Sequence, residues 1–248
     1  MQVNEAKRRL HEIGERVEAL CRAGKYLEAK PQAEEAVALA EKDPENMLTT
    51  SMLDRLARLL QAMGDLKGAR SLFERALALE KKALGIGDSP SDSDLKKIFG
   101  PCRMDREASA DNLASMLQAT GDFNGARQIY ERNLAIRERS LGPDNLQTER
   151  SLTNLASVLQ AMGDFNGARP LYERALAIYE AILGPDHPGT ATSLSNLAAL
   201  LQAMGDLKGA RPLFERALAI KEKALGLDHP DTVQVRNNLV ALVKAEGE

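Results

Sequence analysis

The chain has 248 residues, of which 44% are hydrophobic but only 4% are aromatic and none is tryptophan, so leucine and alanine must supply its core. A formal net charge of −3 gives no basic surface for nucleic acid, and no apolar stretch approaches the length of a membrane span. The two cysteines, Cys21 and Cys102, lack the spacing of a metal or redox site. We expect a reduced, cytoplasmic chain that binds neither membrane nor nucleic acid and needs no cofactor.

The N-terminal residues alternate charged with apolar side chains and do not resemble a signal peptide. Beyond them the chain repeats itself, because the segment LLQAMGDLKGAR at 59–70 recurs unchanged at 200–211. A glycine marks the same point of each copy, and the last three of these glycines lie 42 residues apart. A fixed period of about 20 to 50 residues predicts an array whose repeats bury their apolar faces by stacking. The glycines are Gly24, Gly64, Gly121, Gly163 and Gly205.

The period divides the chain into five repeats and a final half repeat, which we expect to form one solenoid over residues 1–245. The insertion Gly85–Phe99 is rich in Ser, Asp and Pro, which indicates a surface loop. The alternative is that this insertion covers an edge of the binding groove. Arg236 stands at a core position of the half repeat, which is typical of a capping helix rather than a polymerising end. The predicted repeats are 10–49, 50–85, 107–148, 149–190 and 191–232, with the insertion at 86–106 and the capping helix at 232–245.

Each repeat is expected to contain two antiparallel helices, A and B, as the copy that begins at residue 191 illustrates. One face of helix A is apolar. Gly205 then supplies the left-handed conformation that ends a helix, and Asp206 can cap the next one. Helix B runs through Lys221 to Leu225. The apolar positions are Leu194, Leu197, Ala198, Leu201 and Met204 in helix A, and Leu207, Ala210, Phe214, Ala217 and Leu218 in helix B.

The pattern Ala210-x3-Phe214-x2-Ala217, preceded by the leucines of helix A, resembles the tetratricopeptide repeat. The resemblance covers roughly Leu10 to Lys244. It implies an all-α, right-handed α-α superhelical solenoid whose groove binds peptide segments of other proteins. The repeat exceeds the usual length of about 34 residues, so helix B should run on for about two further turns. With links such as LGPDHPGT it resembles the repeats of kinesin light chains, but no heptad segment precedes it, so association with a motor is not implied.

Opposite its core positions, helix A should expose a polar and mostly uncharged face lining the groove. Asparagine recurs there at position 6 of the repeat, glutamine at position 12 and serine at position 9. A ladder of asparagine amides can pair with the N–H and C=O groups of an extended peptide. The alternative is that these amides are merely solvated and were multiplied when the repeats were copied. The residues are Asn112, Asn154, Asn196, Asn238, Gln118, Gln160, Gln202, Ser115 and Ser157.

Between the second and fifth repeats, from the first core leucine to the end of LLQAMGDLKGAR, the only differences lie on this face, which suggests that the face diverged while the framework was held. Arg55 and Arg58 would form a basic end of the groove for an acidic or phosphorylated ligand, with Arg150 as a weaker candidate. The alternative is that Glu15 and Glu18 of the first repeat neutralise these arginines. The differences are Asp54 for Ser195, Arg55 for Asn196 and Arg58 for Ala199.

Helix B carries a recurring Arg-x3-Glu-Arg motif, which predicts i, i+4 ion pairs on a solvated convex face. The aromatic residue at its core position, such as Tyr172 or Phe214, is interpreted as a packing residue. His187 and His229 lie in Asp-His-Pro links, where the prolines and Asp231 indicate helix starts. The sequence shows no metal, nucleophile or phosphate-loop motif, so we predict that the protein is not an enzyme.

These features predict a non-enzymatic adaptor or scaffold, a monomer or weak dimer, that holds an extended segment of a partner protein along the asparagine ladder. A structural or self-associating scaffold that acts through its convex face is the alternative.

Overall fold

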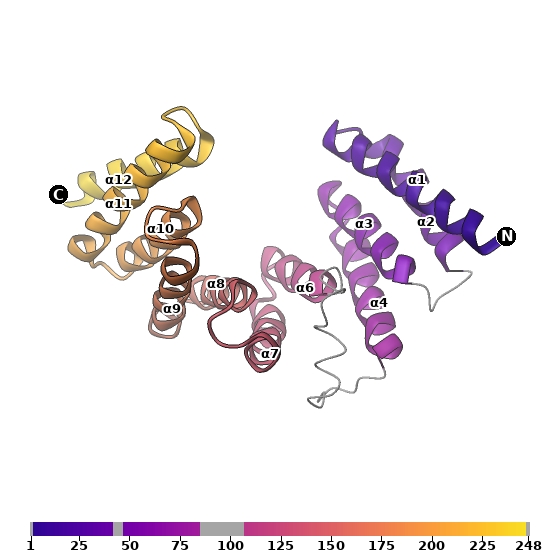
Figure 1. The fold of residues 1–248 in the computed structure, drawn as a ribbon, viewed down its shortest axis with the longest axis horizontal. Helices are drawn as coiled ribbons and strands as arrows, with labels where there is room; N and C mark the ends of the chain where they lie inside the picture. The colour runs from indigo at the N-terminus through magenta and orange to yellow at the C-terminus, as the bar shows by residue number, and fades with distance from the viewer. Residues whose placement is uncertain (1, 42–46, 85–106, 247–248) are drawn as a thin grey trace. The chain divides into compact units, whose positions relative to one another are not determined.

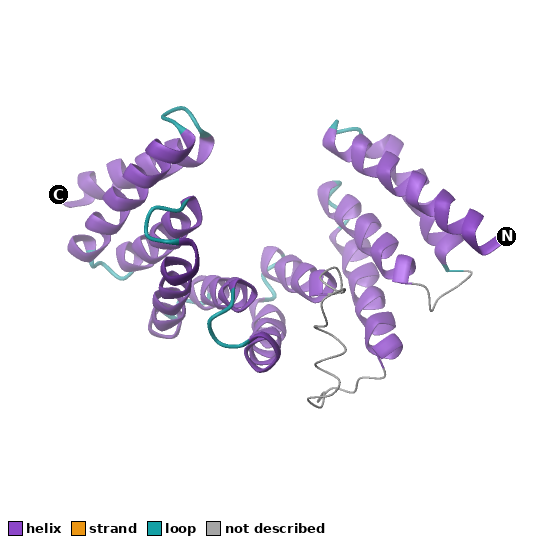
Figure 2. Ribbon diagram, in the orientation of Figure 1, coloured by secondary structure: helices purple, strands orange, loops and turns teal. Residues whose placement is uncertain are grey.

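The computed structural model describes residues 2–41, 47–84 and 107–246, and within these ranges it contains helices and loops but no strand (Figure 2). The helices are labelled in chain order in Figure 1. The earlier ones are α1 (Gln2–Arg22), α2 (Tyr26–Ala40), α3 (Met47–Ala62), α4 (Leu66–Leu84), α6 (Glu107–Ala119) and α7 (Phe123–Leu141). The later ones are α8 (Leu146–Ala161), α9 (Phe165–Leu183), α10 (Pro188–Ala203), α11 (Leu207–Leu225) and α12 (Pro230–Glu246).

The chain divides into two compact halves, an N-terminal half, Met1–Ile129, and a C-terminal half, Tyr130–Glu248. In the N-terminal half each helix from α1 to α4 packs on the next, and α4 packs on α6. In the C-terminal half the same holds from α8 to α12, and the alternate helices α10 and α12 also touch. Each half is therefore a stack of antiparallel helix hairpins, which confirms the expected all-α solenoid fold. The single solenoid domain over 1–245 stays a prediction.

The B helices are as long as the sequence indicated, since α4, α7, α9 and α11 each span 19 residues. The last of them is followed by its C-cap Gly226, which has a φ of 88° and whose N–H donates to the carbonyl of Glu222 at 3.1 Å. A left-handed glycine that satisfies a carbonyl of the final turn is a common helix terminator. The predicted extension of helix B beyond the usual repeat is confirmed.

The predicted bounds of the repeats stay predictions, while the helix α1 begins at Gln2 and α3 begins at Met47. The capping helix α12 spans Pro230–Glu246 rather than the predicted 232–245. At α12 the reason is local, because proline suits the first turn of a helix, where its missing N–H costs nothing. The predicted insertion at 86–106 lies outside the described residues, and so do the whole segment Gly85–Phe99 and Cys102.

An aspartate closes the turn between the two helices of a repeat. In the last full repeat Asp206 Oδ1 accepts a hydrogen bond of 2.9 Å from the N–H of Gly209, directly after the left-handed Gly205. A Cβ on Gly209 would lie 2.4 Å from Asp206 Oδ2, so the capping carboxylate fills the space that a side chain would need. The first repeat has Lys25 in place of the aspartate, without a side-chain cap, and Glu28 in place of the glycine. The recurring Gly-Asp-x-x-Gly sequence is thus one structural element.

Helix A is capped by the residue that precedes its first one. At α10, His187 Nδ1 accepts a hydrogen bond of 3.0 Å from the N–H of Gly189, and at α12, His229 Nδ1 accepts one of 3.2 Å from the N–H of Asp231. Asn145 caps α8 in the same way through its side-chain oxygen. The Asp-His-Pro link starts a helix as expected, but the histidine is itself a capping residue, a role that the sequence pattern did not reveal.

Leucine and alanine form the core, as the composition required. Ala156 of α8 and Ala175 of α9 have no exposed surface, and Leu152 packs against Ala175. The prediction that Met204 lies in the core is wrong, because this residue is only half-buried. The helix α10 ends at Ala203, so Met204 occupies its C-cap beyond the last helical turn.

Ion pairs on the B helices join neighbouring repeats as well as residues of one helix. Arg211 Nε lies 2.9 Å from Glu215, which is the predicted i, i+4 pair. Arg216, the second arginine of the motif, instead reaches Glu180 of the preceding B helix at 2.6 Å. The interpretation of this motif as a solvated surface is therefore incomplete, because its second arginine ties successive repeats together. The same link recurs between Arg174 and Glu138.

We predict that Asp206→Ala lowers the free energy of unfolding by about 1 kcal/mol, because it leaves the N–H of Gly209 without its capping acceptor. Urea denaturation followed by circular dichroism measures this loss. Lys25→Ala is the matched control, since Lys25 holds the same position without a side-chain cap and should lose less than about 0.5 kcal/mol. Equal losses in the two variants would contradict the capping role.

We predict that His187→Asn keeps the stability of the wild type, whereas His187→Ala loses about 1 kcal/mol. Asparagine already caps α8 from Asn145 through the same geometry, so it can replace the imidazole acceptor. The measurement is urea denaturation at neutral pH. If the alanine variant is as stable as the asparagine variant, the hydrogen bond to Gly189 contributes nothing.

Candidate functional site

The candidate site lies on the polar side of the A helices. In the C-terminal half its residues are half-buried, whereas leucines of the same helices, such as Leu155 and Leu197, are only 6% exposed. In the N-terminal half α6 presents the equivalent residues, of which Asn112 and Gln118 are half-buried and Ser115 is exposed. We call the C-terminal set the amide face: Asn154, Ser157 and Gln160 of α8, Asn196, Ala199 and Gln202 of α10, and Asn238 of α12.

The asparagines of the amide face have unused hydrogen-bonding capacity. Within the described part of the chain, Asn154, Asn196 and Asn238 make no side-chain hydrogen bond, although all three are half-buried. In the N-terminal half, Asn112 Nδ2 is buried and likewise has no partner there. Each amide carries two donors and an acceptor, and a polar group that is partly withdrawn from water gains by pairing with a ligand. The structure thus places unpaired amides where the sequence predicted a ladder.

The glutamine of α8 differs from that of α10. Tyr172, which is 4% exposed in the core, donates its hydroxyl proton to Gln160 Oε1 at 3.2 Å. Burial raises the pKa of Tyr172 to about 12, and a hydrogen bond from Ser157 opposes the rise in this pKa. The prediction that the core aromatic only packs is therefore incomplete. The only sequence signal for this role is that tyrosine carries a hydroxyl that a buried site must satisfy.

The arginines of the second repeat have different surroundings. Arg55 Nη2 lies 3.0 Å from Glu18 of α1, so the pairing that the sequence left open does form for this residue. The nearest cationic side chain recorded for Glu15 is not an arginine, since its Oε1 lies 3.5 Å from His11 Nε2 of its own helix. Arg58 is exposed and, among the described residues, has no ion-pair partner. The basic character of this face therefore depends on Arg58 more than on Arg55.

A buried carboxyl lies at the start of α8, next to the exposed Arg150. Glu149 is 3% exposed, and Thr153 Oγ1 donates to its Oε1 at 2.7 Å. Burial raises the pKa of Glu149, although hydrogen bonds from Thr153 and Tyr179 and the charge of Arg150 act in the opposite direction. The pKa of Tyr179 is raised to about 12, by burial first and then by the charge of Glu149. Periodicity gives only a partial signal for this group, because the equivalent residue of α6 is Glu107 whereas that of α10 is the apolar Ala191.

Among the described residues no group of three or more His, Cys, Asp or Glu side chains is placed to hold a metal ion. His187 and His229 use their Nδ1 atoms to cap helices. None of the described helices combines the length and the apolarity needed to cross a bilayer.

Comparison with known proteins gives the same picture of repeats. A family model described as "Tetratricopeptide repeat" matches residues 13–82, 106–181, 147–223 and 193–248. No curated protein sequence matches the chain. The four matched segments together span most of the sequence and overlap by about one repeat in the C-terminal half.

Solved structures of similar fold cover most of the chain. A protein of Podosopora anserina, described as nearly identical TPR-like repeats of a kinesin light chain, is 28% identical with a TM-score of 0.71, over 88% of this chain and 97% of that one. BtubC (BKLC) from P. vanneervenii is 23% identical with a TM-score of 0.67, over 98% and 84%. The apo form of RapI is 13% identical with a TM-score of 0.69, over 96% and 84%. The last two likenesses concern the fold alone, and the first confirms that the repeats are kinesin light chain-like.

We predict that Glu149→Gln stabilises the C-terminal half by up to about 1 kcal/mol at pH 7.5, because the variant avoids burying a charge. The pKa of Glu149 is raised on folding, so the folded state binds the proton more tightly than the unfolded state. The wild type should therefore gain stability as pH falls from the raised pKa towards the ordinary value of 4.5, and its difference from the variant should shrink.

Urea denaturation at several pH values between 7.5 and about 4 measures this difference. Glu215→Gln is the control for loss of one negative charge, because the Glu215 side chain is 51% exposed on α11. A difference that grows towards acid pH would contradict the direction of the shift.

Proposed function

We propose that this chain, which belongs to the tetratricopeptide repeat family, binds an extended segment of a partner protein along the polar faces of its A helices. The family and the stacked hairpins make it a protein-interaction scaffold. The observation that carries the finer proposal is the set of half-buried amides on the amide face, of which Asn154 and Asn196 make no hydrogen bond within the described part of the chain.

The chemistry of these amides suits the backbone of a peptide. An extended segment presents N–H and C=O groups at regular intervals, and an asparagine can both donate to the carbonyl and accept from the N–H. Because such bonds do not involve the side chains of the ligand, binding should tolerate many sequences. The amide face carries no charge, so its contribution to affinity should depend only weakly on salt.

In the N-terminal half the equivalent face carries charged residues. There the positions of Asn196 and Ala199 are taken by Arg55 and Arg58. Arg55 is already paired with Glu18, so an acidic or phosphorylated residue of a segment bound at this half would meet the exposed Arg58. A charge-assisted bond to an exposed arginine adds selectivity, although its strength falls as salt rises.

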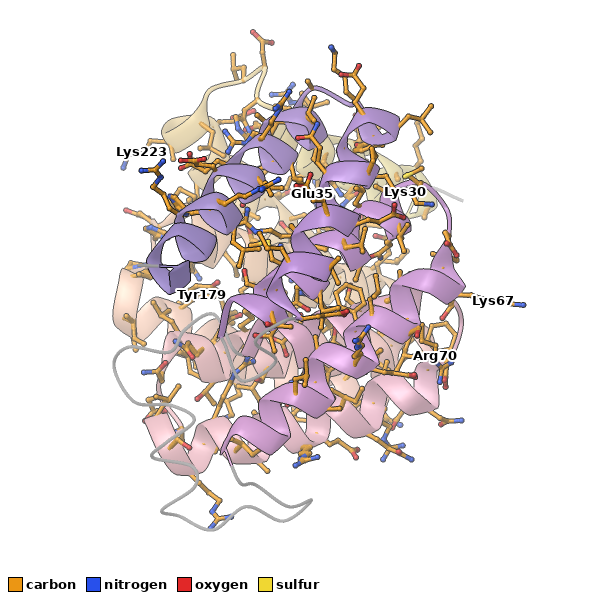
Figure 3. All side chains as sticks on the ribbon, turned by 90° about the vertical axis from the view of Figure 1, so that its right-hand side faces the viewer. Lys30, Glu35, Lys67, Arg70, Tyr179 and Lys223 are labelled. Carbon is orange, nitrogen blue, oxygen red and sulfur yellow. The ribbon has the colours of Figure 1, made fainter. Side chains whose placement is uncertain are left out.

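The convex alternative is less well supported. Arg70 lies with Lys67 on the exposed side of α4 (Figure 3) and pairs with Glu74 of the same helix at 2.8 Å. Arg216 is occupied by Glu180 of the preceding B helix. These B-helix cations are thus used within the chain. A concentration-dependent dimer in sedimentation experiments would favour the alternative.

We predict that the double variant Asn154→Ala and Asn196→Ala reduces binding of the captured partner by about tenfold, because two unpaired amides lose their bonds to the ligand. The partner is captured from native lysate, identified by mass spectrometry, purified, and titrated against both proteins by calorimetry. The thermal midpoint should stay almost unchanged, because neither amide makes a hydrogen bond within the described part of the chain.

Asn166→Ala is the matched control, since this asparagine is exposed on the B helix α9 and lies off the amide face. The control should bind the partner as the wild type does. If the double variant binds with unchanged affinity, the amide face is not the binding surface.

A further inference from the structure

A chain of hydrogen bonds joins two residues of the amide face through a buried tyrosine of the fourth repeat. It begins at Ser157 of α8, passes through the hydroxyl of Tyr172 of α9, and ends at Gln160 of α8, where the distance from Tyr172 Oη to Gln160 Oε1 is 3.2 Å. Tyr172 is 4% exposed, so water cannot easily replace either partner. The Tyr172 hydroxyl donates to the carbonyl oxygen of Gln160.

This direction of donation determines the orientation of the glutamine amide. A tyrosine hydroxyl has a single proton, and because an amide oxygen can only accept, that proton goes to Gln160 Oε1. The carbonyl end of the amide is thereby directed towards the tyrosine. The NH2 end, which carries two donors, is left for a ligand on the amide face.

The neighbouring repeat lacks this arrangement although it keeps the glutamine. Phe214 stands at the position of Tyr172 and has no hydroxyl, and Ala199 stands at the position of Ser157. Gln202 accordingly makes no side-chain hydrogen bond within the described part of the chain. In the sequence, serine at position 9 occurs with tyrosine in two repeats, and other residues occur there with phenylalanine in two others. These pairs are Ser115 with Tyr130, Ser157 with Tyr172, Ala199 with Phe214, and Arg58 with Phe73.

We infer that Tyr172 is a positioning residue that holds the Gln160 amide with its donors towards the ligand, so that the segment bound at α8 must present an acceptor there. The acceptor is a backbone carbonyl or a carboxylate or amide oxygen of the partner. At α10 the amide of Gln202 turns to suit either a donor or an acceptor. The inference rests on the proposed function, because it specifies the ligand chemistry of the same face.

Tyr172→Phe tests the inference with little risk to folding, because phenylalanine occupies this core position in two other repeats. The first readout needs no ligand: nuclear magnetic resonance of the side-chain NH2 groups, with Gln160 assigned from a Gln160→Ala variant. The wild type should show an ordered Gln160 amide and a more mobile Gln202 amide. Tyr172→Phe should make Gln160 as mobile as Gln202, and the double variant Ala199→Ser, Phe214→Tyr should order Gln202. Equal mobility of Gln160 in wild type and Tyr172→Phe would overturn the inference.

The second readout is binding. The probe is a twelve-residue peptide selected from a random phage-displayed library against the wild type, and chosen because Asn154→Ala with Asn196→Ala weakens it. Tyr172→Phe should weaken this peptide by about threefold to tenfold, and should have no effect in a Gln160→Ala background. An unchanged affinity in Tyr172→Phe would overturn the inference while the proposed function stands. A library that yields no peptide dependent on the two asparagines would overturn the proposed function and, with it, the ligand role of Tyr172.

Discussion

The close approach of neighbouring helices is the constraint on which the rest of this structure depends. Alanine stands at the contact points, and Ala156, Ala175, Ala198 and Ala217 have no exposed surface. Side chains this small let two helices pack closely, so a short turn closed by an aspartate cap is long enough to join them. A larger residue at one of these alanines would separate one pair of helices and, through it, disturb the repeats stacked on that pair.

Although the repeats share this framework, the polar groups at equivalent positions make different contacts in different repeats. Tyr179 and Lys221 hold the same position in successive B helices, 42 residues apart. Tyr179 bonds to the buried Glu149, whereas Lys221, only 4% exposed, pairs with Asp231 at 2.9 Å. A buried charge is tolerated only with its partner. A lysine at position 179 or a tyrosine at position 221 would therefore change the hydrogen-bond partners of Glu149 or of Asp231. The repeats are therefore similar in backbone but not interchangeable.

Most of the fold could be predicted from the sequence because its signals are local. Gly205 and Asp206 mark the end of one helix and the start of the next, since conformation and capping depend on residues adjacent in the chain. The site was less predictable because its properties arise between helices. The hydroxyl of Tyr172 reaches Gln160 of another helix, and Glu149 is buried although its counterpart in α10 is the apolar Ala191 and that in α6 is another glutamate, Glu107. Periodicity assigns a residue to a face but does not specify what its side chain reaches.

The N-terminal half shows why a difference between two copies is weak evidence for a ligand. Of the three residues that distinguish the second repeat from the fifth, Asp54 is buried and Arg55 reaches Glu18 of the first repeat at 3.0 Å. The guanidinium needs room there, because a Cβ on Gly14 would lie 2.7 Å from Arg55 Nη1. Of the three, only Arg58 is exposed. Arg55 is thus explained by contact between repeats, whereas nothing in the structure explains why an aspartate replaces the serine at position 54, so these two differences do not by themselves indicate a ligand.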